Sequence, residues 1–336
     1  MAAPASRPVD EQAKPSHEDL LASMTGGMSR DIAPHFAGSD RLRSDGRPKP
    51  EFRAELRQIA DGRNALTSVV TLATPVAIVA VAVWLSHPVV WVLSFFAMAI
   101  AQNRMYILHH EASHRLLFSN RTINDRIGVN LFGWLPLGTG THHYRRAHAN
   151  HHRDEFGPKE PDFLLYSFYP IPFASARRKV ARDAFGVSAY RILKPRVTGI
   201  VKRRYFRNSA RFFSGQILVF TLFVLAGQPW LYLLLWALPY LTFYQVINRL
   251  RSLAEHGGMT RSPDRRHTTH HVRQTLLARG IFVPYGVGYH LAHHVDSGVP
   301  FRNLKTLHMA LKEDGYFPAE AEWPNYRTFW RSCILS

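Results

Sequence analysis

The chain has 336 residues, of which 46% are hydrophobic, so it is long enough to bury a sizeable core. Its single cysteine, Cys333, excludes an intramolecular disulfide, a cysteine-ligated iron–sulfur cluster and a cysteine-rich zinc site. The formal net charge is +18, and 19 residues are histidine. Any metal bound to this chain must therefore be held by nitrogen and oxygen ligands.

The first 64 residues are polar and rich in proline, glycine and serine. Because such a composition buries little apolar surface, we expect residues 1–64 to be a cytosolic segment that is partly disordered. No apolar stretch near the start resembles the core of a signal peptide. Phe52, Leu56 and Ile59 recur at spacings of four and three, which suits a short interfacial helix and an ordinary solvated helix equally.

Four apolar segments follow, and a helix that crosses a bilayer needs roughly 20 such residues. Only Ser86-His87 separates the first two segments, and Gly227-Gln228-Pro229 separates the other two. We therefore predict an all-α integral membrane protein with four transmembrane helices in two hairpins. A soluble helical protein is the less favoured alternative, because two successive uncharged pairs are hard to cover in water. The predicted spans are residues 65–85, 88–108, 212–226 and 230–247.

The distribution of basic residues predicts the orientation. Residues 177–211 hold twelve Lys or Arg and one acid, Asp183, whereas neither short link holds Lys or Arg. Since cytoplasmic loops carry the Lys/Arg excess, we expect the N-terminus, the C-terminus and residues 177–211 on the cytoplasmic side. The multi-pass domain is predicted at residues 65–320, with a tail at 321–336, and the composition favours a bacterial inner membrane.

Histidines gather in four places on the predicted cytoplasmic side. Residues 109–114 read HHEASH, residues 148–152 read HANHH and residues 290–294 read HLAHH. In a helix, positions i, i+3 and i+4 share one face, so each box directs its imidazoles together. Another pair, Glu255-His256, follows the fourth predicted span. The candidate metal ligands are His110, His114, His148, His151, His152, His256, His290, His293 and His294.

Nine histidines are too many for one ion, whereas two ions with four or five nitrogens each fit the number. Imidazole suits zinc, copper, iron and nickel, so the ligand type alone does not select the metal. A cluster of this size at a membrane surface favours two irons that use O₂ as co-substrate to oxidise an unactivated C–H bond. Glu111 and Glu255 neighbour candidate ligands and are expected either to accept a ring N–H or to form surface ion pairs. A membrane metal transporter is a minor alternative, because its ligands would lie within the spans.

The boxes resemble those of membrane fatty acid desaturases and their hydroxylase relatives, from about residue 104 to residue 311. YHLAHHVDSGVPFRNLKTLHMAL (residues 289–311) is similar to the terminal box of the family and the segment after it, and NRLRSLAEHGG (residues 248–258) to the element before it. The resemblance implies four transmembrane helices under a helical cytosolic cap that holds a di-iron site. It implies that His256 is a further ligand, and that each turnover uses O₂ and two external electrons.

The source of those electrons is expected to be a separate protein. A fused cytochrome b5 domain would carry an HPGG motif, which this sequence lacks, so we expect ferredoxin, rubredoxin or a reductase as donor. Neither a bound haem nor a bound flavin is expected. The basic stretch 177–211 favours contact with anionic lipid, an acidic donor or an acyl-carrier phosphate over contact with nucleic acid.

The expected activity is O₂-dependent oxidation of an aliphatic chain of a lipid or acyl substrate, with fatty acyl desaturation as first choice. A hydroxylase or monooxygenase of alkane, fatty acid, sphingoid or carotenoid chains is the alternative, because substrate placement decides between a double bond and an alcohol. Two departures from the family pattern bear on this choice without removing a ligand: Ala292 replaces a common glutamate, and residues 295–297 replace an aromatic and a proline. Phe132 and Trp134 are candidates to line a channel, although core packing is favoured for both.

Overall fold

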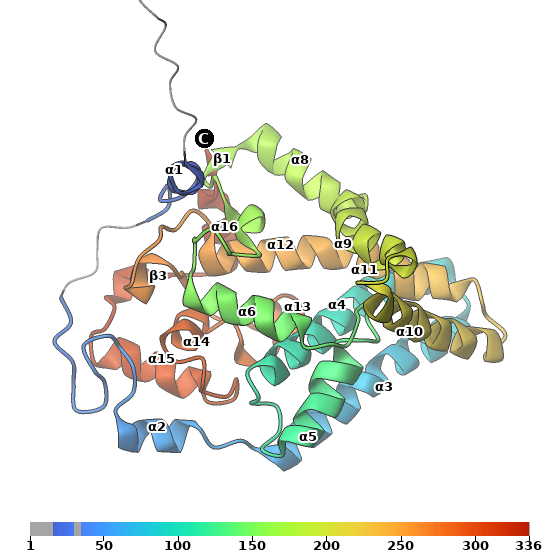
Figure 1. Cartoon of the computed structure of the whole chain (residues 1–336), viewed down its shortest axis with the longest axis horizontal. Coiled ribbons are helices and arrows are strands. Elements are labelled where there is room, and N and C mark those ends of the chain that lie inside the picture. Colours follow the sequence, from blue (N-terminus) through green and yellow to red (C-terminus); the bar gives the residue numbers. More distant parts are fainter. Residues whose placement is uncertain (1–15, 30–34, 336) are drawn as a thin grey trace, which may run out of the picture.

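The computed structural model describes residues 16–29 and 35–335, so the start of the predicted polar segment lies outside the described residues. The described chain is mostly helical, as predicted, with strands of only two residues each (Figure 1). β1 (Ile171–Pro172) pairs in parallel with β4 (Ile334–Leu335), and β2 (His271–Val272) pairs in parallel with β3 (Glu322–Trp323).

The helical elements follow one another along the whole described chain. In the first half they are α1 (His17–Ser23), α2 (Pro50–Leu56), α3 (Asp61–Leu85), α4 (Pro88–Ser113), α5 (Arg121–Ile123), the π-helix η1 (Asn124–Phe132), α6 (His143–Arg153) and α7 (Phe163–Tyr166). In the second half they are α8 (Phe173–Ala184), α9 (Val187–Thr198), η2 (Gly199–Val201), α10 (Phe206–Leu225), η3 (Leu233–Ala237), α11 (Leu238–Leu241), α12 (Phe243–His256), η4 (Arg265–His267), α13 (Leu276–Ile281), η5 (Pro284–Gly286), α14 (His290–Val295), α15 (Leu304–Glu313), η6 (Ala319–Ala321) and α16 (Tyr326–Ser332).

Helices α3 and α4 form a tight hairpin at the predicted break. Ser86 follows the last residue of α3 and adopts the left-handed conformation, with φ of 41°. His87 caps the N-terminus of α4, because its ring nitrogen accepts a hydrogen bond from the Val89 N–H. Pro88 occupies the first position of α4, where its missing N–H costs nothing. The two helices pack directly against each other.

The fourth predicted span is not a single helix. The π-helix η3, the short α11 and α12 follow one another, and the chain bends at Thr242, whose φ of −123° and ψ of −89° are not helical. Pro239 lies at the start of α11, and a proline removes one helical hydrogen bond and bends the chain. The third predicted span is longer than expected and corresponds to α10.

Within the described residues, two helices, α3 and α10, are long and apolar enough to cross a membrane, and most of their residues are exposed in the structure. Helix α4 differs because its second half is buried and includes polar side chains. Gln102 donates to the Trp236 carbonyl at 2.8 Å, and Asn103 donates to the Ile281 carbonyl at 2.9 Å. Helix α4 is therefore the central helix, and the four-span topology remains a proposal.

Residues 39–58, which sequence reasoning places in the polar segment, pack onto the cap. Leu42 and Leu56 are buried. Arg41 donates to the Asp314 carboxylate at 2.5 Å, and the Asn303 amide donates to the Leu56 carbonyl at 2.8 Å. These contacts attach α2 to α15, so this part of the segment has a fixed position.

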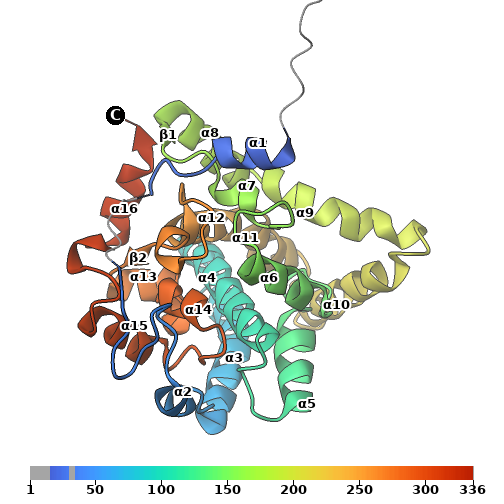
Figure 2. The ribbon, with the colours of Figure 1, turned by 60° about the vertical axis from the view of Figure 1, so that its left-hand side comes forward.

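The two short strand pairs attach the C-terminal residues to the same cap. Ile334 pairs with Ile171, and the Trp330 indole N–H donates to the Leu250 carbonyl of α12 at 3.0 Å. The side chain of Phe329 is fully buried. Figure 1 and Figure 2, which differ by a rotation of 60°, both place α6, α12 and α14 around the end of α4. The cap is therefore a helical assembly built on this end.

Candidate metal centre

Four helices bring the predicted ligands together. His110 and His114 lie at the C-terminal end of α4, and α6 carries the second box along one face. His256 is the last residue of α12, and α14 carries the third box. Gly258 follows with φ of +66°, and a Cβ there would lie 2.4 Å from the Tyr169 carbonyl oxygen, so glycine is required where the chain turns away after His256.

The nine side chains form two groups of potential metal ligands, and within each group the ligand atoms lie within 4.8 Å of one another. Every predicted ligand belongs to one group. The five-histidine group consists of His110, His114, His148, His152 and His293. The four-histidine group consists of His151, His256, His290 and His294.

The rings of the four-histidine group have oxygen atoms behind them. Nδ1 of His151 lies 2.8 Å from the Glu160 carboxylate, and Nδ1 of His256 lies 2.8 Å from the Thr268 carbonyl oxygen. An acceptor at Nδ1 fixes that proton, so the lone pair of Nε2 is free for a metal.

The other two rings of this group follow the same pattern. Nδ1 of His294 is hydrogen-bonded to the Glu155 carboxylate, which also forms an ion pair with Arg265. Nδ1 of His290 lies 3.6 Å from Glu255, whose carboxylate also accepts from Arg251 at 3.2 Å. All four Nδ1 atoms therefore face an oxygen, and four Nε2 atoms remain to bind.

The five-histidine group lacks such acceptors among the described residues. Nδ1 of His110 is buried without a hydrogen-bond partner there. Instead, the rings contact one another: Nε2 of His148 lies 2.9 Å from Nε2 of His114 and 3.1 Å from Nε2 of His152. Packing against neighbouring rings holds these side chains in place.

The arrangement of nitrogens fits a pair of metal ions. Nε2 of His293 and Nε2 of His294 are buried and have no hydrogen-bond partner within the described part of the chain. Nε2 of His290 lies only 3.0 Å from Nε2 of His256. Buried polar atoms are normally paired, and two imidazole lone pairs at this distance repel unless a proton or a cation lies between them. A site this rich in imidazole nitrogen suits iron, zinc, copper or nickel.

Burial keeps most of these rings neutral. It lowers the pKa of eight of the nine histidines, to about 3 for His114. His151 is the exception. Burial lowers its pKa, but the hydrogen bond to Glu160 raises it by a larger amount, so that the pKa is about 9. A metal at Nε2 would displace the proton that this ring otherwise keeps.

The two predicted carboxylate partners have different positions. Glu255 faces His290, as described above, whereas Glu111 accepts a hydrogen bond from the Phe301 N–H at 3.0 Å. Burial raises the pKa of Glu111 to about 8. Sequence reasoning missed Glu155 and Glu160, although both follow the second box by a few residues.

Two cavities lead towards the centre from one side. A small one lies against His110, His148, His151, His256 and His290, and it is also lined by Tyr106 and Tyr144. The same two tyrosines line a larger cavity of about 470 Å³ between α4, α6, α9 and α10. Their hydroxyl groups are hydrogen-bonded at 2.8 Å, so this pair forms the wall between the two cavities. Phe132 lines the larger cavity, whereas the Trp134 indole donates to the Arg211 carbonyl at 2.6 Å.

Comparison with known proteins identifies the family. The fatty acid desaturase family model matches residues 86–326, which include all nine histidines. A dihydrorhizobitoxine desaturase of Bradyrhizobium elkanii is 28% identical over 84% of this chain and 87% of its own length. An sn-1 oleoyl-lipid 12-desaturase of Arthrospira platensis is 23% identical over 68% of this chain and 69% of its own. An sn-1 acyl-lipid omega-3 desaturase (ferredoxin) of Nostoc sp. is 21% identical over 75% and 74%. The chain therefore belongs to the fatty acid desaturase family and is an oxidoreductase.

Proposed function

We propose that this protein desaturates a fatty acyl chain with O₂ at two non-haem irons held by the nine histidines. The observation that carries the proposal is the gathering of four separate histidine motifs into two groups, each with a buried Nε2 atom that has no hydrogen-bond partner among the described residues. Irons bound there would supply the oxidising power for a C–H bond that no side chain can attack.

The stoichiometry of such a reaction requires an electron donor. The substrate gives up two hydrogen atoms as a double bond forms, and O₂ is reduced to two water molecules. Two electrons from the donor and two protons from solvent complete the balance. One of the relatives has ferredoxin in its name, and we extend a donor of that type to this chain.

The substrate would approach the centre through the larger cavity, towards the Tyr106–Tyr144 pair that separates it from the small cavity at the histidines. The larger one lies beside α10, a candidate membrane span, and its lining combines Phe132, Ile192 and Pro195 with several tyrosines. The Tyr106–Tyr144 pair would position the chain before it meets the histidines. A close fit at this wall would hold the reacting methylene groups in one place.

The proposed setting is a membrane crossed by two hairpins, with both termini and the metal centre on the cytoplasmic side. Helices α3 and α10 support one crossing in each hairpin. The basic stretch 177–211 covers most of α8, all of α9 and the start of α10, and its Lys/Arg excess supports a cytoplasmic position.

The test is expression in a bacterial host with ferredoxin and its reductase, followed by mass spectrometry of total lipids. The control is the His151→Ala and His293→Ala double variant, which removes one ligand from each group. We expect new species lighter by two hydrogen atoms with the wild-type chain alone. Species heavier by one oxygen atom would show that the centre hydroxylates its substrate and does not desaturate it. Unchanged lipids from a chain that holds two irons would contradict a host-lipid substrate.

A further inference from the structure

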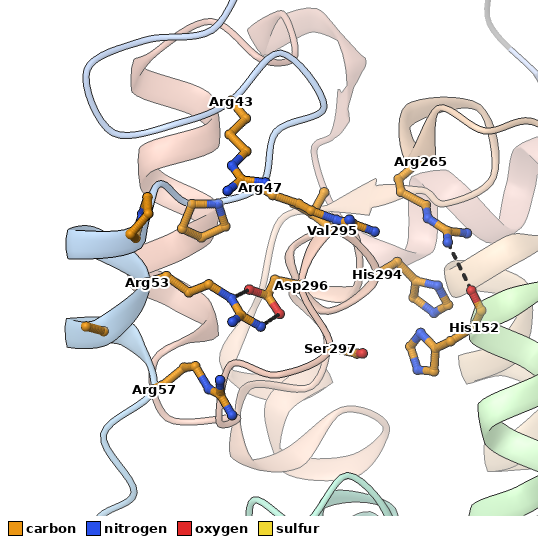
Figure 3. Close-up of a pocket in the computed structure, with 13 residues that line it drawn as sticks. Arg43, Arg47, Arg53, Arg57, His152, Arg265, His294, Val295, Asp296 and Ser297 are labelled. Atoms are coloured by element: carbon orange, nitrogen blue, oxygen red, sulfur yellow. Dashed lines mark hydrogen bonds and ion pairs between the residues drawn. The ribbon is translucent and has the colours of Figure 1, made fainter.

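A pocket lined by arginines opens onto the metal centre from another direction. Its volume is about 660 Å³, and its walls include His152 and His294. Figure 3 shows Arg43, Arg47, Arg53 and Arg57 on one side of it, with the two histidine rings and Arg265 on the other. The first four arginines come from residues 39–58, the part of the N-terminal segment that packs onto the cap.

The pocket has an excess of positive charge. Arg53 forms an ion pair with Asp296 at 2.5 Å, and Arg265 forms one with Glu155. Arg43 and Arg57 have no carboxylate within ion-pair distance in residues 16–29 and 35–335. Both are exposed, as is Arg47, which lies 3.7 Å from Asp45. A concave surface with an excess of guanidinium groups, two of them uncompensated, attracts and orients an acidic partner.

The pocket touches the metal centre on a face that the other cavities do not use. The small cavity on the substrate side contacts five histidines, and neither His152 nor His294 is among them. The arginine pocket contacts only these two. His152 belongs to the five-histidine group and His294 to the four-histidine group, and their rings stack at 4.3 Å with an angle of 28°. A single contact here therefore reaches both groups.

We propose that the arginine pocket is the docking site of an acidic electron-donor protein, which passes electrons to the centre beside the stacked pair His152 and His294. This inference rests on the proposed function. Two reduced one-electron donors dock in turn, each is oxidised by one electron, and the two electrons enter the balance given above for one O₂ and one substrate. The substrate and the donor then approach from different faces, so neither blocks the other.

A lipid surface fits this pocket less well than a protein does. The exposed apolar side chains of α3 begin at Leu66, whereas the apolar lining of the pocket is limited to Pro48, Pro50, Ala54 and Val295. In Figure 1, α2 lies at the opposite end of the molecule from the turn between α3 and α4. Electrostatic attraction without an adjoining apolar belt is typical of a transient protein partner.

The experiment compares two triple variants with the same change of charge. Arg43→Glu, Arg47→Glu and Arg57→Glu reverse the pocket, and Arg177→Glu, Arg191→Glu and Arg203→Glu reverse exposed residues of the basic stretch. Binding of a [2Fe–2S] ferredoxin to the full-length protein in detergent is measured by surface plasmon resonance at several salt concentrations. Reduction of the bound iron by dithionite is followed separately.

We expect the pocket variant to bind ferredoxin at least about 10-fold more weakly and with a flatter salt dependence. The control variant should keep wild-type binding, and dithionite should reduce the iron of both. Wild-type binding by the pocket variant, an equal loss in both variants, or a loss confined to the control would overturn the docking site. Loss of dithionite reduction in the pocket variant would also overturn it, because the arginines would then support the centre itself. A wild-type chain that binds ferredoxin but makes no product would count against the proposed reaction and not against the docking site.

Discussion

The two histidine groups differ in what surrounds their rings. In the four-histidine group each Nδ1 faces an oxygen from Glu155, Glu160, Glu255 or the Thr268 backbone. In the five-histidine group no carboxylate or carbonyl accepts from a ring among the described residues, and the imidazoles pack on one another. The rings of the four-histidine group are therefore oriented by their oxygen partners before a metal binds. The five-histidine group has one more ligand, but fewer hydrogen bonds orient its rings.

This difference matters because ligand number and ligand orientation both contribute to metal affinity. A histidine whose Nδ1–H has an acceptor is held in one tautomer and one ring position. A ring without an acceptor must be fixed by packing and by the metal itself. We therefore expect the four-histidine group to depend on every ligand and on its oxygen partners, and the five-histidine group to tolerate the loss of one ring.

The largest effect is expected from removing a ligand of the four-histidine group. His256→Ala leaves three nitrogens, and His110→Ala leaves four in the other group. We expect the His256→Ala variant to hold one iron fewer per chain and to be at least about 100-fold less active. This loss exceeds the usual effect of removing a group that only hydrogen-bonds to a metal ligand. His110→Ala should retain more iron. Metal analysis of both purified variants checks this, and equal losses would remove the distinction between the groups.

The next effect concerns the carboxylates. Glu160→Gln keeps the shape of the side chain but removes the charge that faces Nδ1 of His151. We expect the iron affinity of the chain to fall about 10-fold, at the lower end of the range for outer partners. Dialysis against a graded series of chelator concentrations measures it. Wild-type retention of iron would mean that the carboxylate does not orient this ring.

Glu111→Gln should have a smaller effect and a different one. The amide oxygen can still accept from the Phe301 N–H, so we expect about 1 kcal/mol or less of lost stability. Iron content should match that of the wild type. Thermal unfolding in detergent and metal analysis test both parts. Loss of iron would restore the role beside His110 that the sequence predicts for Glu111.

The smallest effect is expected at Thr268. His256 contacts the backbone carbonyl of this residue, and Thr268→Ala leaves that carbonyl in place. We expect iron affinity within about 2-fold of the wild type and a loss of roughly 1 kcal/mol in stability from the hydroxyl contacts. A large loss of iron, seen in the same chelator series, would show that the loop and not the carbonyl alone orients His256.

The sequence predicts that the nine histidines come together, because their spacing within each box is local. Histidines at i, i+3 and i+4 share a helical face whatever the rest of the fold does. All nine predicted ligands lie in the two groups, and the chain breaks at Ser86-His87 where the apolar pattern changes. The mostly helical class follows from the same periodicity.

Other features depend on tertiary contacts and could not be read from the pattern. Glu111 neighbours His110 in sequence, but successive helical positions point about 100° apart, so its carboxylate meets Phe301 instead. Glu155 and Glu160 reach the rings through an irregular turn after α6. From the sequence, the arginines of residues 39–58 are predicted to lie in a solvated segment. In the structure, contacts such as that between Arg41 and Asp314 attach this part of the chain to the cap.

The most direct test of the central claim is Mössbauer spectroscopy of the full-length protein loaded with ⁵⁷Fe. Two groups with different ligand numbers and different outer partners predict two irons per chain and two distinguishable quadrupole doublets of equal area. A chain that holds no iron, or a single iron with one doublet, would contradict the assignment of the nine histidines to two metal sites.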